Sequence, residues 1–352
     1  MAYNTLCLTM VAACMALTAP SSVAFQERDR NAALDYWSLI EMRHGELYGA
    51  MFDDRLLAIL DEMQPKPESG AEPINEPAEL AEGGTYGELL ERHSLFLDNI
   101  ERASSVEACD FQIRYEDGFD MMLPHLGGIR PLVRLLVVDA RRLALSGHEE
   151  RAARRLVAAL AIARHLVGDR HLISSMVAIS AFETTVLECH WLLDRVDDTA
   201  EVRELIATGL SGFVIGDTFG IVPAILTEVN STRLIAKRYK GPNAAVEYGL
   251  AGMSETADEE DRALRGEYWR LFVGDRFEEE VDLAVTAFDE LLAAWKSDNP
   301  TEALKVFRER IRDGEYGDVA PTVMPWYQNV YRVDSRARNE LQRIRERVLS
   351  DG

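Results

Sequence analysis

The sequence is short of positive charge, of catalytic signatures and of long apolar runs. The chain has 38 Lys and Arg residues but 60 Asp and Glu residues, so its formal net charge is -22 over 352 residues. A surface with that excess of negative charge repels nucleic acid and anionic membranes. We therefore expect no nucleic-acid partner. At 47% hydrophobic residues, the chain can still bury a core.

Patterns typical of catalytic and metal sites are also missing. The chain has no G-x-S-x-G, no Walker loop, no G-x-G-x-x-G and no H-E-x-x-H. His165 and His171 are six residues apart, so they diverge on a helix. Cys189 and His190 are adjacent and point about 100° apart, which makes a poor nucleophile and base. We expect no catalytic residue, no metal and no cofactor.

The one long apolar run stands at the N-terminus, from Leu6 to Ala19, and no charged side chain precedes Glu27. Small residues at Ser22-Val23-Ala24 suit signal peptidase. We predict a signal peptide over residues 1–24 and an exported mature chain, periplasmic or secreted. The run is shorter than the roughly 20 residues that cross a bilayer, so we expect no transmembrane span in the mature chain.

The chain has four cysteines, of which Cys7 and Cys14 fall within the predicted signal peptide. Val11-Ala12-Ala13-Cys14 also resembles a lipoprotein box, so an anchor at Cys14 is the alternative to cleavage after Ala24. In an oxidising compartment Cys109 and Cys189 can pair as a disulfide. Two buried free thiols are the other possibility, and the spacing does not decide between them.

Apolar side chains recur at helical spacing through most of the chain, and almost no segment alternates as a strand does. We predict an all-α fold, either a helical bundle or a short array of antiparallel helix hairpins. Glycines and β-formers in residues 210–223 indicate a short strand or an irregular buried loop. The predicted helices cover 31–42, 47–63, 86–103, 127–146, 149–167, 172–195, 199–209, 219–239, 257–272, 276–297, 300–312 and 335–349.

Proline, glutamate and glycine gather in residues 64–87, a composition typical of a linker or long loop. This stretch separates N-terminal helices at 25–63 from a main helical domain at 88–352. A candidate sub-boundary lies near 196–220.

Residues 145–166, LSGHEERAARRLVAALAIARHL, predict the second half of a helix hairpin with its turn at Gly147. The same apolar stripe runs along both of its helices. We expect the hairpin to bury four leucines and the next helix to cover its second side with three residues. The leucines are Leu136, Leu143, Leu156 and Leu160, and the covering residues are Met176, Ile179 and Leu187.

Residues 130–170 carry nine arginines against four acids, a local reversal of charge sign. One interpretation is a surface patch that binds an anionic partner, because guanidinium groups pair with carboxylate and phosphate. The other is a solvated helix face paired with the protein's own acids. Arg141, Arg151 and Arg155 are expected off the apolar arc or at its edge. The candidate patch consists of Arg141, Arg142, Arg151, Arg154 and Arg155.

The hairpin resembles a tetratricopeptide unit over about residues 132–166. Gly147, Ala152, Leu156 and Ala159 match that family's pattern, whereas Asp139 stands at a leucine position and Arg164 at a proline position. The chain has no convincing second copy, and a single repeat does not make an array.

A broader resemblance rests on NAALDYW at 31–37, Cys109-Asp110-Phe111, LPHL at 123–126 and the arginine-rich hairpin. Together these segments resemble a group of exported all-helical bacterial proteins to which no activity is assigned. The resemblance implies export and an all-helical fold, and it implies no catalytic residue. We expect a non-catalytic interaction or scaffold protein of the cell envelope, whose partner is another envelope protein. The alternative is an envelope hydrolase with a cleft site built from several helices.

Overall fold

The structure is a computed structural model. It describes residues 30–42, 80, 84–196, 200–214, 216–240, 243–244, 247, 266, 276–324 and 327–349. These residues form an all-α fold, as predicted, and none of them is in a strand. The predicted signal peptide 1–24, the predicted helix 47–63, all of the predicted helix 257–272 except residue 266, and most of the predicted linker 64–87 lie outside the described residues.

Most predicted helices are present, with small shifts at their ends, but the helix expected over 335–349 begins eight residues earlier, at Tyr327. The helix expected over 86–103 is divided at His93, and its first part begins at Thr85, inside the predicted linker. In chain order, the elements are α2 (Ala32–Met42), α5 (Thr85–Arg92), α6 (Ser94–Ser104), the 3-10 helix η4 (Tyr115–Asp120), α7 (Pro124–Leu145), α8 (Glu149–Val167), α9 (Leu172–Arg195), α10 (Ala200–Ser211), α11 (Ile221–Arg238), α14 (Phe277–Trp295), α15 (Pro300–Arg312), α16 (Ala320–Val323) and α17 (Tyr327–Leu349).

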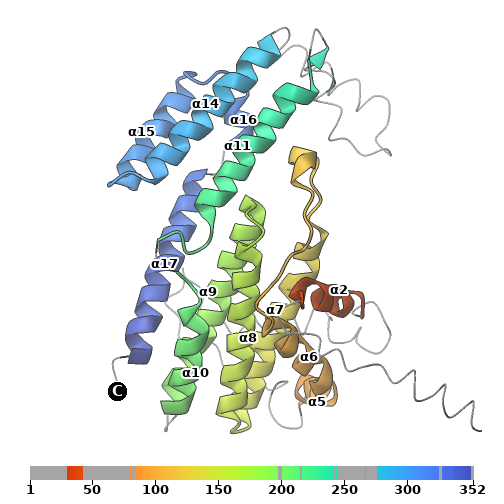
Figure 1. The fold of residues 1–352 in the computed structure, drawn as a ribbon. Helices are drawn as coiled ribbons and strands as arrows, with labels where there is room; N and C mark the ends of the chain where they lie inside the picture. Colours follow the sequence, from red (N-terminus) through yellow and green to blue (C-terminus); the bar gives the residue numbers. More distant parts are fainter. Residues whose placement is uncertain are drawn as a thin grey trace, which may run out of the picture.

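Helices α7 and α8 form the predicted antiparallel hairpin at the centre of the lower bundle (Figure 1). Leu136, Leu143, Leu156 and Leu160 are all fully buried, as predicted. Gly147 has a φ of 72°, a left-handed conformation that glycine adopts without steric cost, and it permits the tight turn. The short turn and the shared apolar stripe together determine how the two helices pack.

Helix α9 lies against both helices of the hairpin and also contacts α10, α11 and α17. By length and composition it could cross a membrane, but 61% of its most apolar stretch is buried inside the bundle. Ile179 is buried and Met176 packs against the core, as expected. Leu187, in contrast, is exposed, because the next residue, Glu188, is the one that faces α7.

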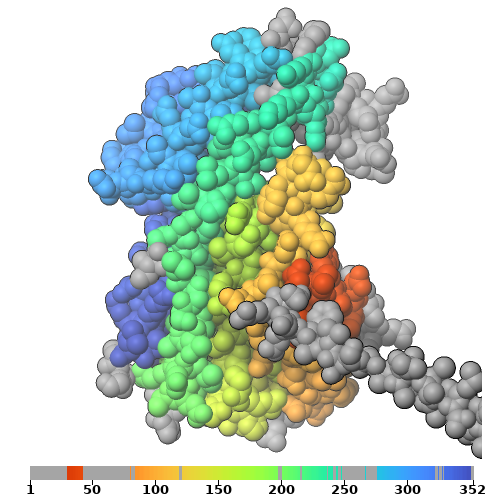
Figure 2. Space-filling view, viewed as in Figure 1, coloured from red at the N-terminus to blue at the C-terminus, as the bar shows by residue number. Residues whose placement is uncertain are grey.

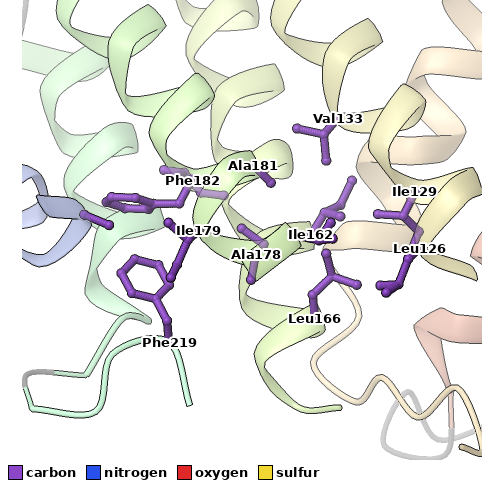
Figure 3. Close-up of a cluster of buried hydrophobic side chains, with 14 of the residues drawn as sticks. Leu126, Ile129, Val133, Ile162, Leu166, Ala178, Ile179, Ala181, Phe182 and Phe219 are labelled. Atoms are coloured by element: carbon purple, nitrogen blue, oxygen red, sulfur yellow. The ribbon is translucent and has the colours of Figure 1, made fainter. Parts of the chain in front are cut away.

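The apolar core runs through the lower bundle from α7 to α11. Figure 3 shows Leu126 and Ile129 of α7 beside Ile162 and Leu166 of α8, with Ile179 and Phe182 of α9 further along. Phe182 meets Phe213 and Phe219 with ring centroids 5.0 and 5.2 Å apart. These two rings anchor the segment between α10 and α11. The region 210–223, predicted as a strand or buried loop, consists of helix ends and, at 212–214 and 216–220, a loop.

Helix α2 and the α5–α6 pair cover the other side of the hairpin (Figure 1). The approach of α2 to α7 depends on Gly128, because a Cβ there would lie 2.6 Å from the Ile40 side chain. At the start of α2, the Asn31 side chain donates to the Asp110 carbonyl at 2.9 Å and accepts from the Asp110 amide at 2.8 Å. The segment before η4 is thereby joined to α2.

Helix α11 leads out of the lower bundle to a second group, in which it packs on α14, and α14 packs on α15 and α16 (Figure 1). Helix α17 then runs back along α9 and α10 and connects the two groups. It brings buried apolar residues such as Ala337 and Ile344 to the core, and it also makes polar contacts with α9. Arg336 forms a two-pronged ion pair with Glu183, and His190 lies 2.9 Å from Glu340.

Candidate functional site

The five arginines of the candidate patch are not one surface. Arg141, Arg142 and Arg155 are only 3%, 6% and 2% exposed, whereas Arg154 is exposed and Arg151 is half-buried. The expectation that Arg141 and Arg155 lie off the apolar arc or at its edge is therefore wrong. Of the two interpretations, pairing with the protein's own acids fits the structure better. It predicted a solvated helix face, however, and three of the arginines are buried.

The reason is Asp139, which lies on the apolar stripe of α7 and is completely buried. Arg142 donates from Nε to one Asp139 oxygen at 2.8 Å, and Arg155 of α8 donates from Nε to the other at 2.9 Å. Both guanidinium groups then reach outward to partly exposed acids. Arg142 bonds Glu91 of α5, and Arg155 bonds Asp98 and Glu101 of α6. We call these six residues the Asp139 network.

Arg141 makes a separate buried contact between α7 and α9. It donates two hydrogen bonds to Glu188, at 2.5 and 2.7 Å, and its guanidinium lies 3.5 Å from the centre of the Trp191 ring. Burial raises the pKa of Glu188 even though Arg141 opposes the shift. Because these contacts use one edge and a face of a buried guanidinium, Arg141 is a structural cation.

The two cysteines are free thiols, so the disulfide that the sequence left open is not present. The Cys109 carbonyl lies near Gly168, just before α9 begins. Cys189 is eighteenth in α9, about 25 Å along the helix axis at 1.5 Å per residue. That separation is far beyond the roughly 7 Å that a disulfide can bridge.

Three short motifs from distant parts of the chain meet around His125. The His125 Nε2 lies 2.8 Å from an Asp169 oxygen, and both side chains are almost fully buried. Phe111 stacks on the His125 ring with centroids 4.1 Å apart, and Trp37 meets the same ring edge-on. NAALDYW, Cys109-Asp110-Phe111 and LPHL therefore contribute to one buried cluster, which we call the His125 cluster.

Two residues that strain the backbone lie next to the His125 cluster. Gln112 and Arg170 are the non-glycine residues of the described chain with positive φ, 55° and 49°. Gln112 follows Phe111, and Arg170 follows Asp169. Strain of this kind persists only where the surroundings hold it, so the cluster is tightly specified. His125 is 1% exposed and Asp169 is 4% exposed, so solvent barely reaches the pair.

His171 and Glu228 connect the start of α9 with α11. The His171 Nδ1 accepts the Ile173 amide at 3.2 Å, which places the proton of the neutral ring on Nε2. That nitrogen lies 3.6 Å from Glu228 Oε1. Burial raises the pKa of Glu228 to about 7 and lowers the pKa of His171. The Glu228 carboxyl is thus poised to change charge near neutral pH.

An open groove lies where the second helix group meets α17. Its volume is about 460 Å³, and we call it the α14–α17 groove. In Figure 2 the surface is indented between the α14–α15 pair and α17. A smaller hollow, of about 170 Å³, lies between α2 and α6. The groove is lined by Gly216, Asp217, Val222, Trp295, Lys296, Pro300, Tyr331, Ser335, Arg338 and Asn339.

The walls of the groove are fixed by the neighbouring helices. Trp295 and Tyr331 meet edge to face, with ring centroids 5.2 Å apart. Arg345 of α17 donates to the carbonyls of Leu210 and Phe213, which holds the loop before α11. The groove therefore combines a rigid aromatic pair with polar and cationic side chains, as ligand sites commonly do.

The residues of the groove come from segments that are separated along the chain by up to about 120 positions. None of them belongs to the sequence-predicted patch. The only sequence signal here is the run Trp295-Lys296 to Pro300, which marks a helix end and the next helix start. Nothing in that run indicates that α17 and the loop before α11 lie opposite.

Comparisons with known proteins identify no related protein. The chain matches no protein-family model, no curated protein and no solved structure. The resemblances to a tetratricopeptide unit and to exported helical bacterial proteins therefore stay predictions.

The first prediction concerns the Asp139 network. Replacing Arg155 by Met leaves Asp139 short of a buried cation, and we expect a loss of roughly 3–5 kcal/mol in the free energy of unfolding. The matched control is Arg154→Met on the same helix, which removes an exposed pair with Glu150. That change should cost less than about 1 kcal/mol. Chemical denaturation measures both, and equal small losses would show that the network stabilises little.

The second prediction concerns Glu228 and pH. When folding raises the pKa of an acid, the acid contributes fully to stability at a pH below its pKa in the unfolded state. That contribution is lost as the pH rises through its pKa in the folded state. For Glu228 that window runs from 4.5 to about 7. Relative to Glu228→Gln, the natural protein should therefore lose roughly 2–3 kcal/mol of stability between pH 5 and 8.

Comparing the two proteins separates the effect of Glu228 and its neighbour His171, 3.6 Å away, from the effects of His165 and His190. Burial lowers the pKa of His165 to about 4 and also lowers that of His190, and these groups change stability in the opposite direction. Their contributions cancel in the difference between the natural protein and Glu228→Gln. Parallel stability curves for the two proteins from pH 5 to 8 would contradict the predicted role of Glu228.

Proposed function

We propose that this chain is a non-catalytic interaction protein of the cell envelope that binds its partner in the α14–α17 groove. One observation carries this proposal, namely the open groove with an aromatic pair and two cations among its lining residues. Aromatic and arginine side chains are enriched where proteins bind partners, because they offer much contact area and several donors. The rigid helical surroundings support a preformed site.

Placement of this function in the envelope rests on the N-terminal sequence. The apolar run from Leu6 to Ala19 and the small residues up to Ala24 support export with cleavage before Phe25. The net charge of -22 supports a protein partner over nucleic acid.

The competing hydrolase is favoured by the His125 cluster, where a histidine and an aspartate converge from separate elements. A catalytic pair has to contact its substrate. His125 and Asp169 are covered by Phe111 and lie almost entirely inside the protein. Their position supports a role in joining α7 to the start of α9, so binding in the groove is the function we propose.

A photo-crosslinking experiment tests the groove as the contact surface. Benzoylphenylalanine replaces Asn339, an exposed groove residue, in the native host. The control places it at Glu346, which is exposed two turns further along α17. We expect a discrete crosslinked species from position 339 alone, with an N-terminal sequence on this chain that begins at Phe25.

Two results would count against the proposal. Equal crosslinking from positions 339 and 346 would show that the groove has no special role. A protein recovered with Met1 in place would show that the chain is not processed for export.

A further inference from the structure

We propose that the α14–α17 groove binds a carboxylate that stands beside an apolar side chain, the chemistry of the C-terminal end of a peptide chain. This inference rests on the proposed function, because it names the class of ligand for the same groove. Three properties of the groove carry it: the balance of charge, the aromatic pair and the volume.

The acids of the groove already have partners within the protein. Asp217 accepts the backbone amides of Ile221 and Val222, at 2.9 Å and 3.2–3.3 Å, and so caps the start of α11. Asp334, which lies behind the groove and is 3% exposed, pairs with Arg338 at 2.8 Å. Asp334 is thus neutralised by Arg338, whereas Asp217 keeps its negative charge but forms no ion pair with the groove cations Lys296 and Arg338 within the described residues.

The cations of the groove are less fully satisfied. Lys296 is exposed, and within the described residues no carboxylate lies within ion-pair distance of it. Arg338 bonds Asp334 and Ser335 through Nη2, which leaves other guanidinium donors, and its side chain is 34% exposed. In a chain of net charge -22, an unpaired ammonium beside a guanidinium favours an anionic group as the missing partner.

The amount of free charge favours a carboxylate over a phosphate. A phosphate monoester carries about -1.5 to -2 at neutral pH, whereas a carboxylate carries a single negative charge. One unpaired lysine matches one charge. A second negative charge would have to compete with Asp334 for Arg338, and Asp217 stands nearby to repel it.

Trp295 and Tyr331 favour an apolar side chain next to the carboxylate of the ligand. Their edge-to-face packing forms one wall, and Val222 and Pro300 add apolar surface to the lining. The groove volume of about 460 Å³ lies within the range of roughly 300–1,000 Å³ typical of ligand sites. That space accommodates a few residues of an extended chain with one large side chain against the rings.

Fluorescence polarisation with labelled tripeptides tests the inference on the full chain. The probe is a dye-labelled Ala-Ala-Phe with a free C-terminal carboxylate, and its C-terminal amide differs only in charge. We expect the acid to bind about tenfold or more tightly than the amide, as for one charge-assisted hydrogen bond. Ala-Ala-Ala with a free carboxylate should bind more weakly than the phenylalanine peptide, because it lacks the side chain for the rings.

Variants place the binding in the groove. Lys296→Gln should remove most of the preference for the acid, and Tyr331→Leu should remove the preference for phenylalanine. The control is Lys237→Gln, which changes an exposed lysine in the last turn of α11, away from the groove, and should leave both preferences intact. Thermal unfolding of each variant shows that the fold is kept.

The outcomes separate the ligand class from the proposed function. Equal binding of acid and amide, or an acid preference that survives Lys296→Gln, overturns the carboxylate inference. If N-acetyl-phenylalanine competes as well as the tripeptide, the site takes small aromatic acids, and the inference of a peptide end is overturned. If no peptide binds while position 339 still crosslinks to a partner, the ligand class is wrong and the proposed function stands.

Discussion

Asp139 is a carboxylate buried at the centre of a helix hairpin, and a charge in that position is tolerable only when cations and hydrogen bonds surround it. Arg142 and Arg155 supply both, one to each oxygen. Each arginine then needs a partner of its own, and α5 and α6 provide those acids at the rim. The buried charge therefore helps to hold α5 and α6 against the hairpin, alongside their buried apolar residues such as Leu90 and Phe96.

The same logic extends outward through the bundle. Arg141 fastens α7 to α9 through Glu188, and α9 in turn holds α17 through Glu183 and His190. Helix α17 then supplies one wall of the α14–α17 groove, while Arg345 holds the loop that supplies another. Polar contacts between packed elements therefore recur from the hairpin, through α9 and α17, to the groove where we place binding.

Much of the fold can be predicted from the sequence because its helices carry a regular apolar stripe and end at turn residues. The bounds of α8 and α9 agree with the prediction, since Gly147 and the Gly168-Asp169 turn mark them clearly. The same reasoning places the arginines wrongly on the surface, because an arginine is predicted to be exposed unless a buried acidic partner has been identified for it. Asp139 offered the missing signal. It stands on the apolar stripe, at a position where the tetratricopeptide pattern has leucine.

The groove could not be predicted, since it depends on which helices lie opposite each other, and local periodicity carries no such information. The Asp139 network is the claim on which the rest depends, and a double-mutant cycle between Asp139→Asn and Arg155→Gln measures it most directly. If Asp139 and Arg155 act as one unit, unfolding free energies should show a coupling near the upper end of about 0.5–3 kcal/mol. Losses that simply add, within about 0.5 kcal/mol, would contradict the account.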